Sequence, residues 1–231
     1  MARCAINPET MQHNKFKIVK AKKSKKVAIV GAGIGGMEAA RVLALRGHVP
    51  VIFEKSEKLG GVFNAAAAPY FKEKDKELLA WYAKEIKDLN IEVRFNSEIT
   101  SKDQLKGFDD VIVASGAEAN RPRIPGLEKS IEACDYLYGK EVGDKVIIIG
   151  GGLTGCEIAY DLFKKGKTPI IVEMKNDLIA VKGVCLANSS FLRDFFELNK
   201  VEVHLETSLV KVTDSGVVVR DKDGKEFEIA G

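Results

Sequence analysis

The sequence predicts an α/β protein made of two similar halves, and two observations lead to that prediction. The first is an internal repeat: residues 27–54 align with residues 146–173 without a gap, at an offset of 119, and twelve of the 28 positions are identical. The second is the order of patterns in each copy, where an apolar run, a glycine-rich turn, a helical stretch and a second apolar run follow one another. Such units form parallel sheets covered by helices.

Each copy reads as one strand–turn–helix–strand unit. Residues 27–30 and 146–149 are continuous apolar runs, as expected for strands buried on both faces of a parallel sheet. The helical stretches then run to about Arg46 and Lys165. A glycine follows in both copies, at the position where helices often end in a left-handed residue. The second apolar run of each copy ends at an acidic residue.

The spacing of the glycines is that of a dinucleotide-binding turn. In G-x-G-x-x-G the first glycine permits the tight turn, the second lets the backbone approach a diphosphate, and the third lets the helix pack closely on the strand. The diphosphate then sits at the helix N-terminus, where free N–H groups and the helix dipole favour negative charge. The candidate glycines are Gly31, Gly33 and Gly36 in the first copy and Gly150, Gly152 and Gly155 in the second.

Each copy also carries a candidate ribose-binding acid. Glu54 lies 23 residues after Gly31, and Glu173 lies 23 residues after Gly150. A carboxylate at this position accepts hydrogen bonds from the adenosine ribose hydroxyls. The two fingerprints and the two acids together predict two Rossmann-like dinucleotide-binding halves.

Two further segments assign FAD to the first half. Residues 58–61 (KLGG) resemble the loop beside the FAD diphosphate in two-nucleotide flavoproteins, and residues 109–117 resemble the strand and turn that end the first FAD crossover in those proteins. The alternative for the second segment is a buried strand that meets a glycine turn. The predicted FAD contacts are Gly31, Gly33, Gly36, Glu54, Lys55, Gly61, Val62, Ser115 and Gly116.

The second half is then predicted to bind NAD(H). Glu173 favours NADH over NADPH, because a carboxylate repels a 2′-phosphate and pairs with a 2′-hydroxyl. Glu157 is a candidate for orienting the nicotinamide end, and a solvent-facing helix carboxylate is the equal alternative. The predicted contacts are Gly150, Gly152, Leu153, Thr154, Gly155, Glu157 and Glu173.

The C-terminal part predicts a small antiparallel sheet. A strand is expected at residues 201–204, and a three-stranded β-meander is expected over residues 209–229. Its strands are separated by two turns, at residues 214–216 and 223–224, each containing aspartate and glycine. The predicted fold is therefore a layered α/β fold with parallel sheets and an added meander.

Composition excludes several classes of protein. Of the 231 residues, 45% are hydrophobic and 30% are charged, as in ordinary globular proteins. No apolar run approaches the roughly 20 residues of a membrane span, and the N-terminus lacks the apolar core of a secretory signal, so a cytoplasmic location is expected. The net charge is +3, and the lysine-rich segment 15–26 is interpreted as a solvated linker rather than a nucleic-acid-binding site.

The cysteines exclude one mechanism. No two cysteines form a Cys-x-x-Cys or Cys-x4-Cys pair, so a redox-active disulfide of the thioredoxin-reductase or glutathione-reductase kind is not expected. Cys134, Cys156 and Cys185 are expected to be buried or inert. The three histidines are isolated in the sequence, and no catalytic acid–base residue is predicted.

Taken in order, the motifs resemble one group of flavoproteins. The chain carries CAINP at residues 4–8, the lysine-rich segment, VGAGIGGMEAA, KLGGVFNAAAAP, VIVASGA, RPRIPG and IIIGGGLTGCE. This order is similar to that of the C-terminal module of the Old Yellow Enzyme-like NADH:flavin oxidoreductases, which include 2,4-dienoyl-CoA reductase, 2-enoate reductase and trimethylamine dehydrogenase. The resemblance covers essentially the whole chain, and CAINP and GGVFNA are its most specific parts.

The resemblance implies a larger parent enzyme. A full member carries an N-terminal barrel with FMN and the substrate, a [4Fe–4S] cluster held by four cysteines, and then this module. NADH reduces FAD, and electrons pass through the cluster to FMN, which reduces an activated C=C bond. Cys4 matches the last cluster cysteine, and because one thiolate cannot hold a cluster, it is an expected iron–sulfur ligand in the intact parent only.

The two fingerprints, with RPRIPG at residues 121–126 between the halves, also predict domain limits. We expect a linker at residues 1–24, an FAD-binding half at 25–124 and an NAD(H)-binding half at 125–231. In the family the chain then returns to the FAD half with a Gly-Asp pair, and this sequence shows no such segment before Gly231. The FAD half is therefore expected to be incomplete, and these 231 residues alone are expected to hold FAD weakly.

Two functions from different classes follow from these patterns. The first is part of an oxidoreductase that binds FAD and NADH, with nucleotides and the FMN barrel of the parent as partners and an oligomer compatible with the sequence. The second is a nucleotide-holding structural module with ADP in the first site, as in trimethylamine dehydrogenase. The intact second fingerprint favours the first function, and the final substrate is not given by the sequence.

Overall fold

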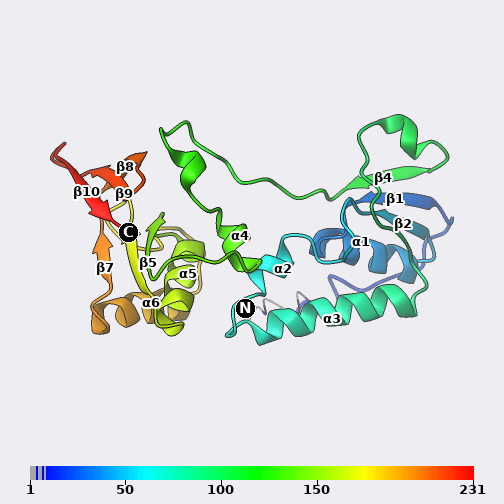
Figure 1. Cartoon of the computed structure of the whole chain (residues 1–231). Coiled ribbons are helices and arrows are strands. Elements are labelled where there is room, and N and C mark those ends of the chain that lie inside the picture. Colours follow the sequence, from blue (N-terminus) through cyan, green and yellow to red (C-terminus); the bar gives the residue numbers. More distant parts are fainter. Residues whose placement is uncertain (1–3, 5–6, 8) are drawn as a thin grey trace. The chain divides into compact units, whose positions relative to one another are not determined.

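The chain divides into two compact units, Met1–Ala119 and Asn120–Gly231 (Figure 1). The computed structural model describes residues 4, 7 and 9–231, so part of the CAINP segment lies outside the described residues. The division falls five residues before the sequence-based boundary at 124. Arg121 lies between these two positions and forms an ion pair with Glu132 of the second unit at 2.9 Å.

The first unit is built on a four-stranded parallel sheet. Its strand order is β3-β2-β1-β4, so the strand that precedes the first fingerprint has a neighbour on each side. The elements of this unit are β1 (Lys26–Val30), α1 (Ile34–Leu45), β2 (Val49–Phe53), α2 (Phe63–Ala66), α3 (Glu73–Asp88), β3 (Glu92–Arg94), the short 3-10 helix η1 (Lys102–Leu105) and β4 (Asp110–Val113).

Helices α1 and α3 cover one face of this sheet (Figure 1). Ile29 of β1 and Ile52 of β2 are fully buried there and belong to one core cluster with Met37 of α1. The other face is covered by the segment between β3 and β4. In that segment Phe108 meets Phe53 of β2 edge-on, with ring centroids 5.6 Å apart. The first unit is therefore layered, with α-helices on one face of the sheet and the segment that contains η1 on the other.

The second unit contains two sheets. A three-stranded parallel sheet has the order β5-β6-β7, and an antiparallel sheet has the order β10-β9-β8. The elements of this unit are the short 3-10 helix η2 (Leu127–Lys129), α4 (Ala133–Leu137), β5 (Lys145–Ile149), α5 (Leu153–Lys164), β6 (Thr168–Val172), α6 (Leu186–Leu198), β7 (Glu202–His204), β8 (Ser208–Val212), β9 (Gly216–Arg220) and β10 (Glu226–Ala230).

The parallel sheet of this unit lies between helices and the meander. Ile171 of β6 packs in the cluster that contains Phe196 of α6, whereas its neighbours Ile170 and Val172 pack in the cluster that contains Val219 of β9. Successive side chains of a strand point to opposite faces, so β6 is buried on both sides. This arrangement has three layers, and the predicted α/β fold class is confirmed.

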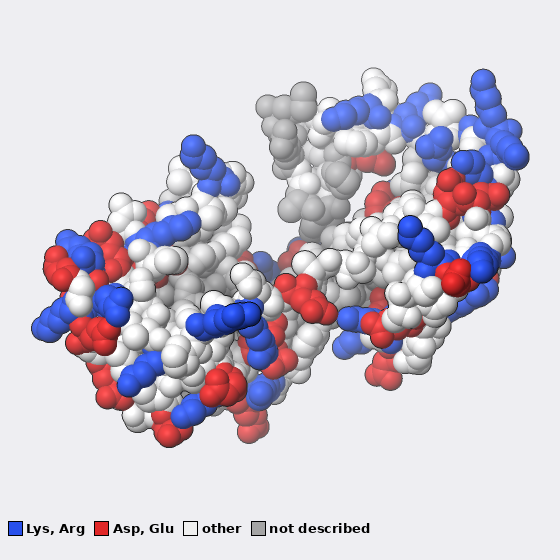
Figure 2. Space-filling model, turned by 90° about the horizontal axis from the view of Figure 1, so that it is seen from above, with Lys and Arg blue, Asp and Glu red and all other residues white. Residues whose placement is uncertain are grey.

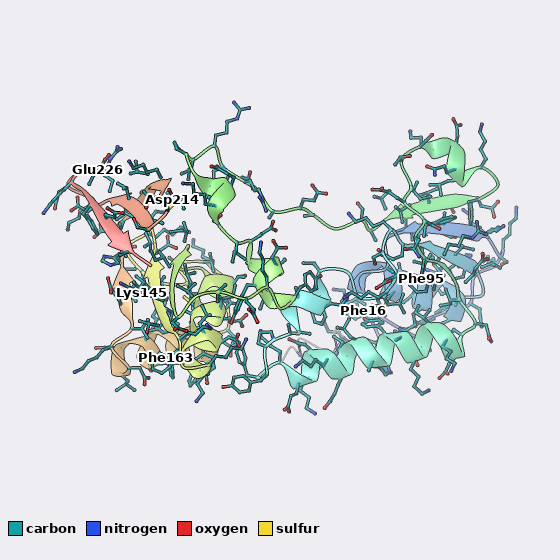
Figure 3. All side chains as sticks on the ribbon, viewed as in Figure 1. Phe16, Phe95, Lys145, Phe163, Asp214 and Glu226 are labelled. Carbon is teal, nitrogen blue, oxygen red and sulfur yellow. The ribbon has the colours of Figure 1, made fainter. Side chains whose placement is uncertain are left out.

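Contacts between distant elements complete the second unit. Phe163 of α5, labelled in Figure 3, meets Phe195 of α6 edge-on, with ring centroids 5.2 Å apart. Asp214 in the turn after β8, also labelled there, pairs with Lys129 of η2 at 2.6 Å. A Cβ at Gly126 would lie 2.1 Å from the carbonyl oxygen of Val212, so only glycine permits the chain before η2 to come this close to β8.

The sequence-based element ends agree with the structure to within one residue. Helix α1 ends at Leu45 and α5 ends at Lys164. The glycines that follow, Gly47 and Gly166, have φ angles of +90° and +77°, as predicted for left-handed residues beyond a helix end. The predicted meander is present as β8, β9 and β10.

The structural repeat is longer than the aligned sequence. A left-handed residue precedes the third strand of each parallel sheet, Asn90 (φ 50°) before β3 and Lys200 (φ 53°) before β7. A second such pair, Asn96 (φ 50°) and Glu206 (φ 51°), follows these strands. The two members of each pair lie 110 residues apart in the sequence rather than 119, so an alignment without gaps does not match them.

Charges of both signs are interspersed over the face of the chain shown in Figure 2. At the end of the lysine-rich segment, Lys25 pairs with Asp110 (2.7 Å), and the Lys26 N–H donates to Asp109 (2.7 Å). These contacts fasten the segment to the start of β4. Among the described residues, no helix is long and apolar enough to cross a membrane.

The third fingerprint glycine sets the distance between helix and strand in both units. A Cβ at Gly36 would lie 1.9 Å from the carbonyl oxygen of Gly31, and a Cβ at Gly155 would lie 1.9 Å from that of Gly150. These carbonyls belong to the backbone and cannot move aside cheaply. By contrast, a Cβ at Gly35, the neighbouring helix position, would meet nothing within 4 Å.

We therefore expect Gly36→Ala and Gly155→Ala each to destabilise the chain, by at least about 1–3 kcal/mol, the usual cost of overpacking. Thermal and urea unfolding followed by circular dichroism would measure the effect. Gly35→Ala is the matched control and should be neutral or stabilising, because alanine exceeds glycine in helix propensity by about 1 kcal/mol. Equal behaviour of Gly35→Ala and Gly36→Ala would contradict the packing role of the third glycine.

Candidate functional site

The first fingerprint glycines occupy left-handed backbone at the carboxyl ends of the central strands. Gly31 has φ +104° and Gly150 has φ +107°. The N–H of Gly31 donates to Phe53, and that of Gly150 donates to Val172, both at 2.8 Å. The turn is therefore fastened to the end of the neighbouring second strand in both units.

The second fingerprint glycines lie at the helix N-termini. Gly33 is the N-cap of α1 and Gly152 is the N-cap of α5, and neither helix has a side-chain cap. A Cβ at either glycine would meet nothing within 4 Å. The first-turn N–H groups of a helix lack partners within the helix, so this open space is suited to a diphosphate.

Glu54 is buried beside the first glycine loop, with 6% of its surface exposed. Its Oε2 accepts the backbone N–H of Ala32 at 2.7 Å, and its Oε1 accepts both the N–H and the hydroxyl of Ser56 at 2.8 Å. Burial alone would raise the pKa of Glu54, but these donors and the nearby Lys55 lower it below its ordinary value. The carboxylate is therefore ionised at neutral pH.

Glu173 repeats this arrangement in the second unit. It is 8% exposed, its Oε2 accepts the N–H of Gly151 at 2.6 Å, and its Oε1 accepts the N–H of Lys175 at 2.8 Å. Gly151 and Lys175 lie 119 residues after Ala32 and Ser56, so the same backbone positions donate in both units. We call this arrangement the carboxylate clasp. A carboxylate has about four acceptor positions, so each clasp keeps room for a ribose hydroxyl.

The predicted FAD-side loop lies directly on the first fingerprint. The N–H of Gly60 donates to the carbonyl of Ala32 at 2.9 Å, and a Cβ at Gly61 would lie 3.1 Å from the Cα of Gly33. Val62 follows as the exposed N-cap of α2. The structure thus brings loop and fingerprint together, and contact of this loop with FAD stays a prediction.

The second unit has a counterpart of this loop that sequence reasoning missed. The N–H of Ile179 donates to the carbonyl of Gly151 at 2.7 Å, at the position 119 residues after Gly60. Ile179 also has a left-handed backbone, with φ 52°. No glycine marks the position in the sequence, and only the continued offset could have indicated it.

The other predicted FAD contacts lie near the same edge of the sheet. Ser115 and Gly116 follow β4, and a Cβ at Gly31 would lie 3.1 Å from the Cα of Ser115 and 2.4 Å from the carbonyl oxygen of Ala114. Lys55 follows Glu54 and is exposed. Gly150 has no such neighbour within 4 Å among the described residues, because the second parallel sheet there has three strands rather than four.

The remaining predicted NAD(H) contacts lie on α5. Leu153 and Thr154 form its first turn, next to the open space at Gly152, and Glu157 lies one turn further along and is half-buried. Its counterpart in the first unit, Glu38, pairs with Arg41 at 2.8 Å. The ion pair of Glu38 does not test whether Glu157 orients the nicotinamide, so that role stays a prediction.

All four cysteines are free thiols. Cys156 is fully buried on α5, and burial, followed by the charge of Glu173, raises the pKa of its thiol to about 12. Cys134 is half-buried, with a raised pKa that is due mainly to burial. Cys185 is exposed at the N-cap of α6, where Leu186 at the start of the helix is exposed as well, so of the two expected alternatives, buried or inert, burial is excluded for this cysteine.

Cys4 is exposed, and its Sγ accepts the backbone N–H of Asn7 at 3.4 Å. Among the described residues, no group of three or more His, Cys, Asp or Glu side chains is arranged to hold a metal ion.

Comparison with known proteins places this geometry in a family. A family model described as "Pyridine nucleotide-disulphide oxidoreductase" matches residues 25–231. The chain belongs to this family. Its members bind FAD and NAD(P)H, so the prediction of these two cofactors is confirmed for the family, whereas the assignment of each contact to a residue stays a prediction.

Individual relatives agree with this assignment. The chain is 43% identical over 227 residues to cinnamate reductase of Clostridium sporogenes, a match that covers 96% of the chain and 34% of the relative. It is 35% identical over 235 residues to an NADH oxidase of Thermoanaerobacter brockii, covering 97% of the chain and 36% of the relative. A solved structure of 2-naphthoyl-CoA reductase with 2-naphthoyl-CoA matches 99% of the chain and 35% of its own, with a TM-score of 0.87 and 29% identity.

These matches confirm the oxidoreductase class and the resemblance to flavin-dependent reductases. The chain spans about a third of the length of these relatives. The activity of the whole protein is therefore addressed as a proposal below.

The burial of Cys156 leads to a test of thiol reactivity. In the native chain at pH 8, iodoacetamide should modify the exposed Cys4 and Cys185 and leave Cys156 unmodified, because a thiol with a pKa of about 12 is almost entirely protonated. Peptide mass spectrometry after timed labelling would measure this. Unfolding in urea should make all four cysteines react at similar rates, and rapid native labelling of Cys156 would contradict the buried position of α5.

Proposed function

We propose that the chain is the nucleotide-binding module through which electrons enter a longer NADH-dependent reductase. In this proposal residues 25–124 bind FAD and residues 125–231 bind NADH. When both are bound, the nicotinamide supplies a hydride and the flavin accepts it. The chain itself supplies binding and positioning, and we assign no acid–base residue.

The observation that carries this proposal is the repeated carboxylate clasp. In both units the clasp holds the residue between the first two glycines, and in both units the space before the helix N-terminus is open at the second glycine. A glycine-rich loop that occurs once can be a purely structural turn, but two loops built on the same hydrogen bonds support two dinucleotide sites. The second clasp also disfavours the alternative of a structural module that holds only ADP.

In this proposal each group has a defined task. The first-turn N–H groups of α1 and α5 bind the diphosphates, and Glu54 and Glu173 accept ribose hydroxyls. Glu173 selects NADH, because a buried carboxylate would repel a 2′-phosphate. Lys55, Gly61, Val62, Ser115 and Gly116 are proposed to border the FAD.

The proposal for the whole protein includes further cofactors outside this chain. The resemblance supports an FMN-containing barrel, a [4Fe–4S] cluster, a cytoplasmic location and an acceptor with an activated C=C bond. Cys4 is exposed and its sulfur accepts an N–H, which fits one of the four thiolates that a cluster requires. Oligomerisation is compatible with this proposal.

The proposal is tested by two paired glycine variants. Gly33→Val should weaken FAD binding at least tenfold and spare NADH, because the side chain would fill the space proposed for the diphosphate. Gly152→Val should weaken NADH binding at least tenfold and spare FAD. Titrations of the chain with each nucleotide, followed by flavin and NADH fluorescence, measure both affinities.

The same samples test hydride transfer. With FAD in excess, NADH added without oxygen should bleach the flavin absorbance of the wild-type chain and bleach it far more slowly in Gly152→Val. Circular dichroism serves as the folding control, and the fold should persist because a Cβ at either glycine would meet nothing within 4 Å. Loss of both nucleotides from one variant would contradict two sites, and binding of ADP without FAD would favour the structural module.

A further test concerns the choice between NADH and NADPH. Glu173→Ala should weaken NADH binding by about tenfold or more, since a hydrogen bond to a charged group contributes about 1.5–3 kcal/mol. Because Glu173 also holds Gly151, the variant should weaken NADPH as well, though less. The ratio of the two affinities is therefore the informative measurement. Glu54→Ala should leave this ratio unchanged, and an unchanged ratio in Glu173→Ala would remove Glu173 from specificity.

A further inference from the structure

The two carboxylate clasps differ at one side chain. Both clasps use a backbone N–H from the glycine loop and a backbone N–H from the residue two positions after the acid. At that second position the first unit has Ser56 and the second unit has Lys175. The Ser56 hydroxyl adds a third donor to Glu54 at 2.8 Å, whereas the Lys175 ammonium donates to the carbonyl of Ala180 at 3.3 Å.

Ser56 also joins the clasp to the neighbouring loop. Its Oγ lies 3.0 Å from the carbonyl oxygen of Lys58 and 3.5 Å from the N–H of Lys58. Lys58 begins the KLGG loop, whose Gly60 donates to the carbonyl of Ala32. When the Ser56 hydroxyl donates to Glu54, its Oγ can accept the N–H of Lys58, so contacts run from the glycine loop through Glu54 and Ser56 to the KLGG loop, which returns to the glycine loop through Gly60.

We propose that Ser56 is a positioning residue of the first nucleotide site, which holds the Glu54 carboxylate toward the adenosine ribose and couples it to the KLGG loop. Ser56 is half-buried and lies outside both glycine fingerprints. Because the second unit has lysine at this position, the extra donor belongs to one site only. It gives the site of the resident cofactor a more firmly held acid than the site of the nucleotide that must exchange at each turnover.

The surroundings of Glu54 support this assignment. Lys55 is its charged neighbour along the chain. Arg94, whose carbonyl accepts the Glu54 N–H, has its guanidinium paired with Glu92 at 2.7 Å and placed over the Phe53 ring. Among the residues that the structure describes, the donors to the carboxylate oxygens are the two backbone N–H groups and the Ser56 hydroxyl. Removal of the Ser56 hydroxyl should therefore shift the pKa of the Glu54 carboxyl without removing a charged group.

The inference rests on the proposed assignment of FAD to the first unit, so its experiment has one arm without nucleotide. In that arm, the pKa of the Glu54 carboxyl is followed by carbon-13 NMR in the ligand-free chain. Ser56→Ala should raise this pKa, because a donor to the ionised form is lost. Ser56→Thr keeps the hydroxyl and should restore the wild-type value. An unchanged pKa in Ser56→Ala would overturn the proposal.

The second unit provides a matched control. Lys175→Ala removes the side chain at the equivalent position and should leave the pKa of the Glu54 carboxyl unchanged, because the Lys175 side chain donates to the carbonyl of Ala180 rather than to a carboxylate. A shifted Glu54 pKa in this variant would count against the proposal.

The second arm measures FAD affinity. Ser56→Ala should weaken FAD binding by about threefold to tenfold, the usual range for one hydrogen bond, and should leave NADH binding unchanged. In a Glu54→Gln background the same substitution should have little further effect, since the two residues act through one contact. If Ser56→Ala shifts the Glu54 pKa but the wild-type chain binds no FAD, the proposed function fails and the positioning role stands. If FAD binds equally to both chains, the positioning role fails and the proposed function stands.

Discussion

The hydrogen bond between a buried carboxylate and the glycine loop is the contact on which the geometry of both sites depends. Burial of a charged group is costly unless donors surround it, so the acid and the loop fix each other in place. The sheet register prepares this contact, because Val30 pairs with Phe53 in the first unit and Ile149 pairs with Val172 in the second. The residues after these strands, a glycine and a glutamate, are then adjacent without any further adjustment.

The position of the helix follows from the same turn. A chain that leaves the strand through a left-handed glycine can begin a helix three residues later only if the helix comes close to the turn, and the third glycine permits this approach to the carbonyl of Gly31 or Gly150. The helix N-terminus is thereby aimed at the edge of the sheet where the acid also lies. Three separate requirements, for the turn, the packing and the burial of a carboxylate, therefore converge on one small volume in each unit.

The sequence could predict those parts of the site that only particular residue types can form. Glycines at the turn and at the close contact, and acids at the strand ends, were identified for this reason. It could not predict the donors at Ala32, Gly151 and Ile179, because every residue except proline supplies a backbone N–H. The third strands also escaped the alignment, since the second unit is nine residues shorter before β7 and little identity remains there. Similarly, the exposure of Cys185 depends on the packing of α6, which no local pattern records.

A comparison of the two units shows what a duplicated scaffold can vary. Ala32 is fully buried in the first loop, whereas a Cβ at its counterpart Gly151 would lie 2.6 Å from Leu178 and 3.0 Å from Glu173. The second loop therefore needs glycine for its close approach to the acid, whereas the first loop accommodates a buried alanine side chain. The hydrogen bonds that define the fold are made by backbone groups and persist through such changes. Side chains around them are free to diverge, so the two units can share one geometry while they differ at positions such as Ser56 and Lys175.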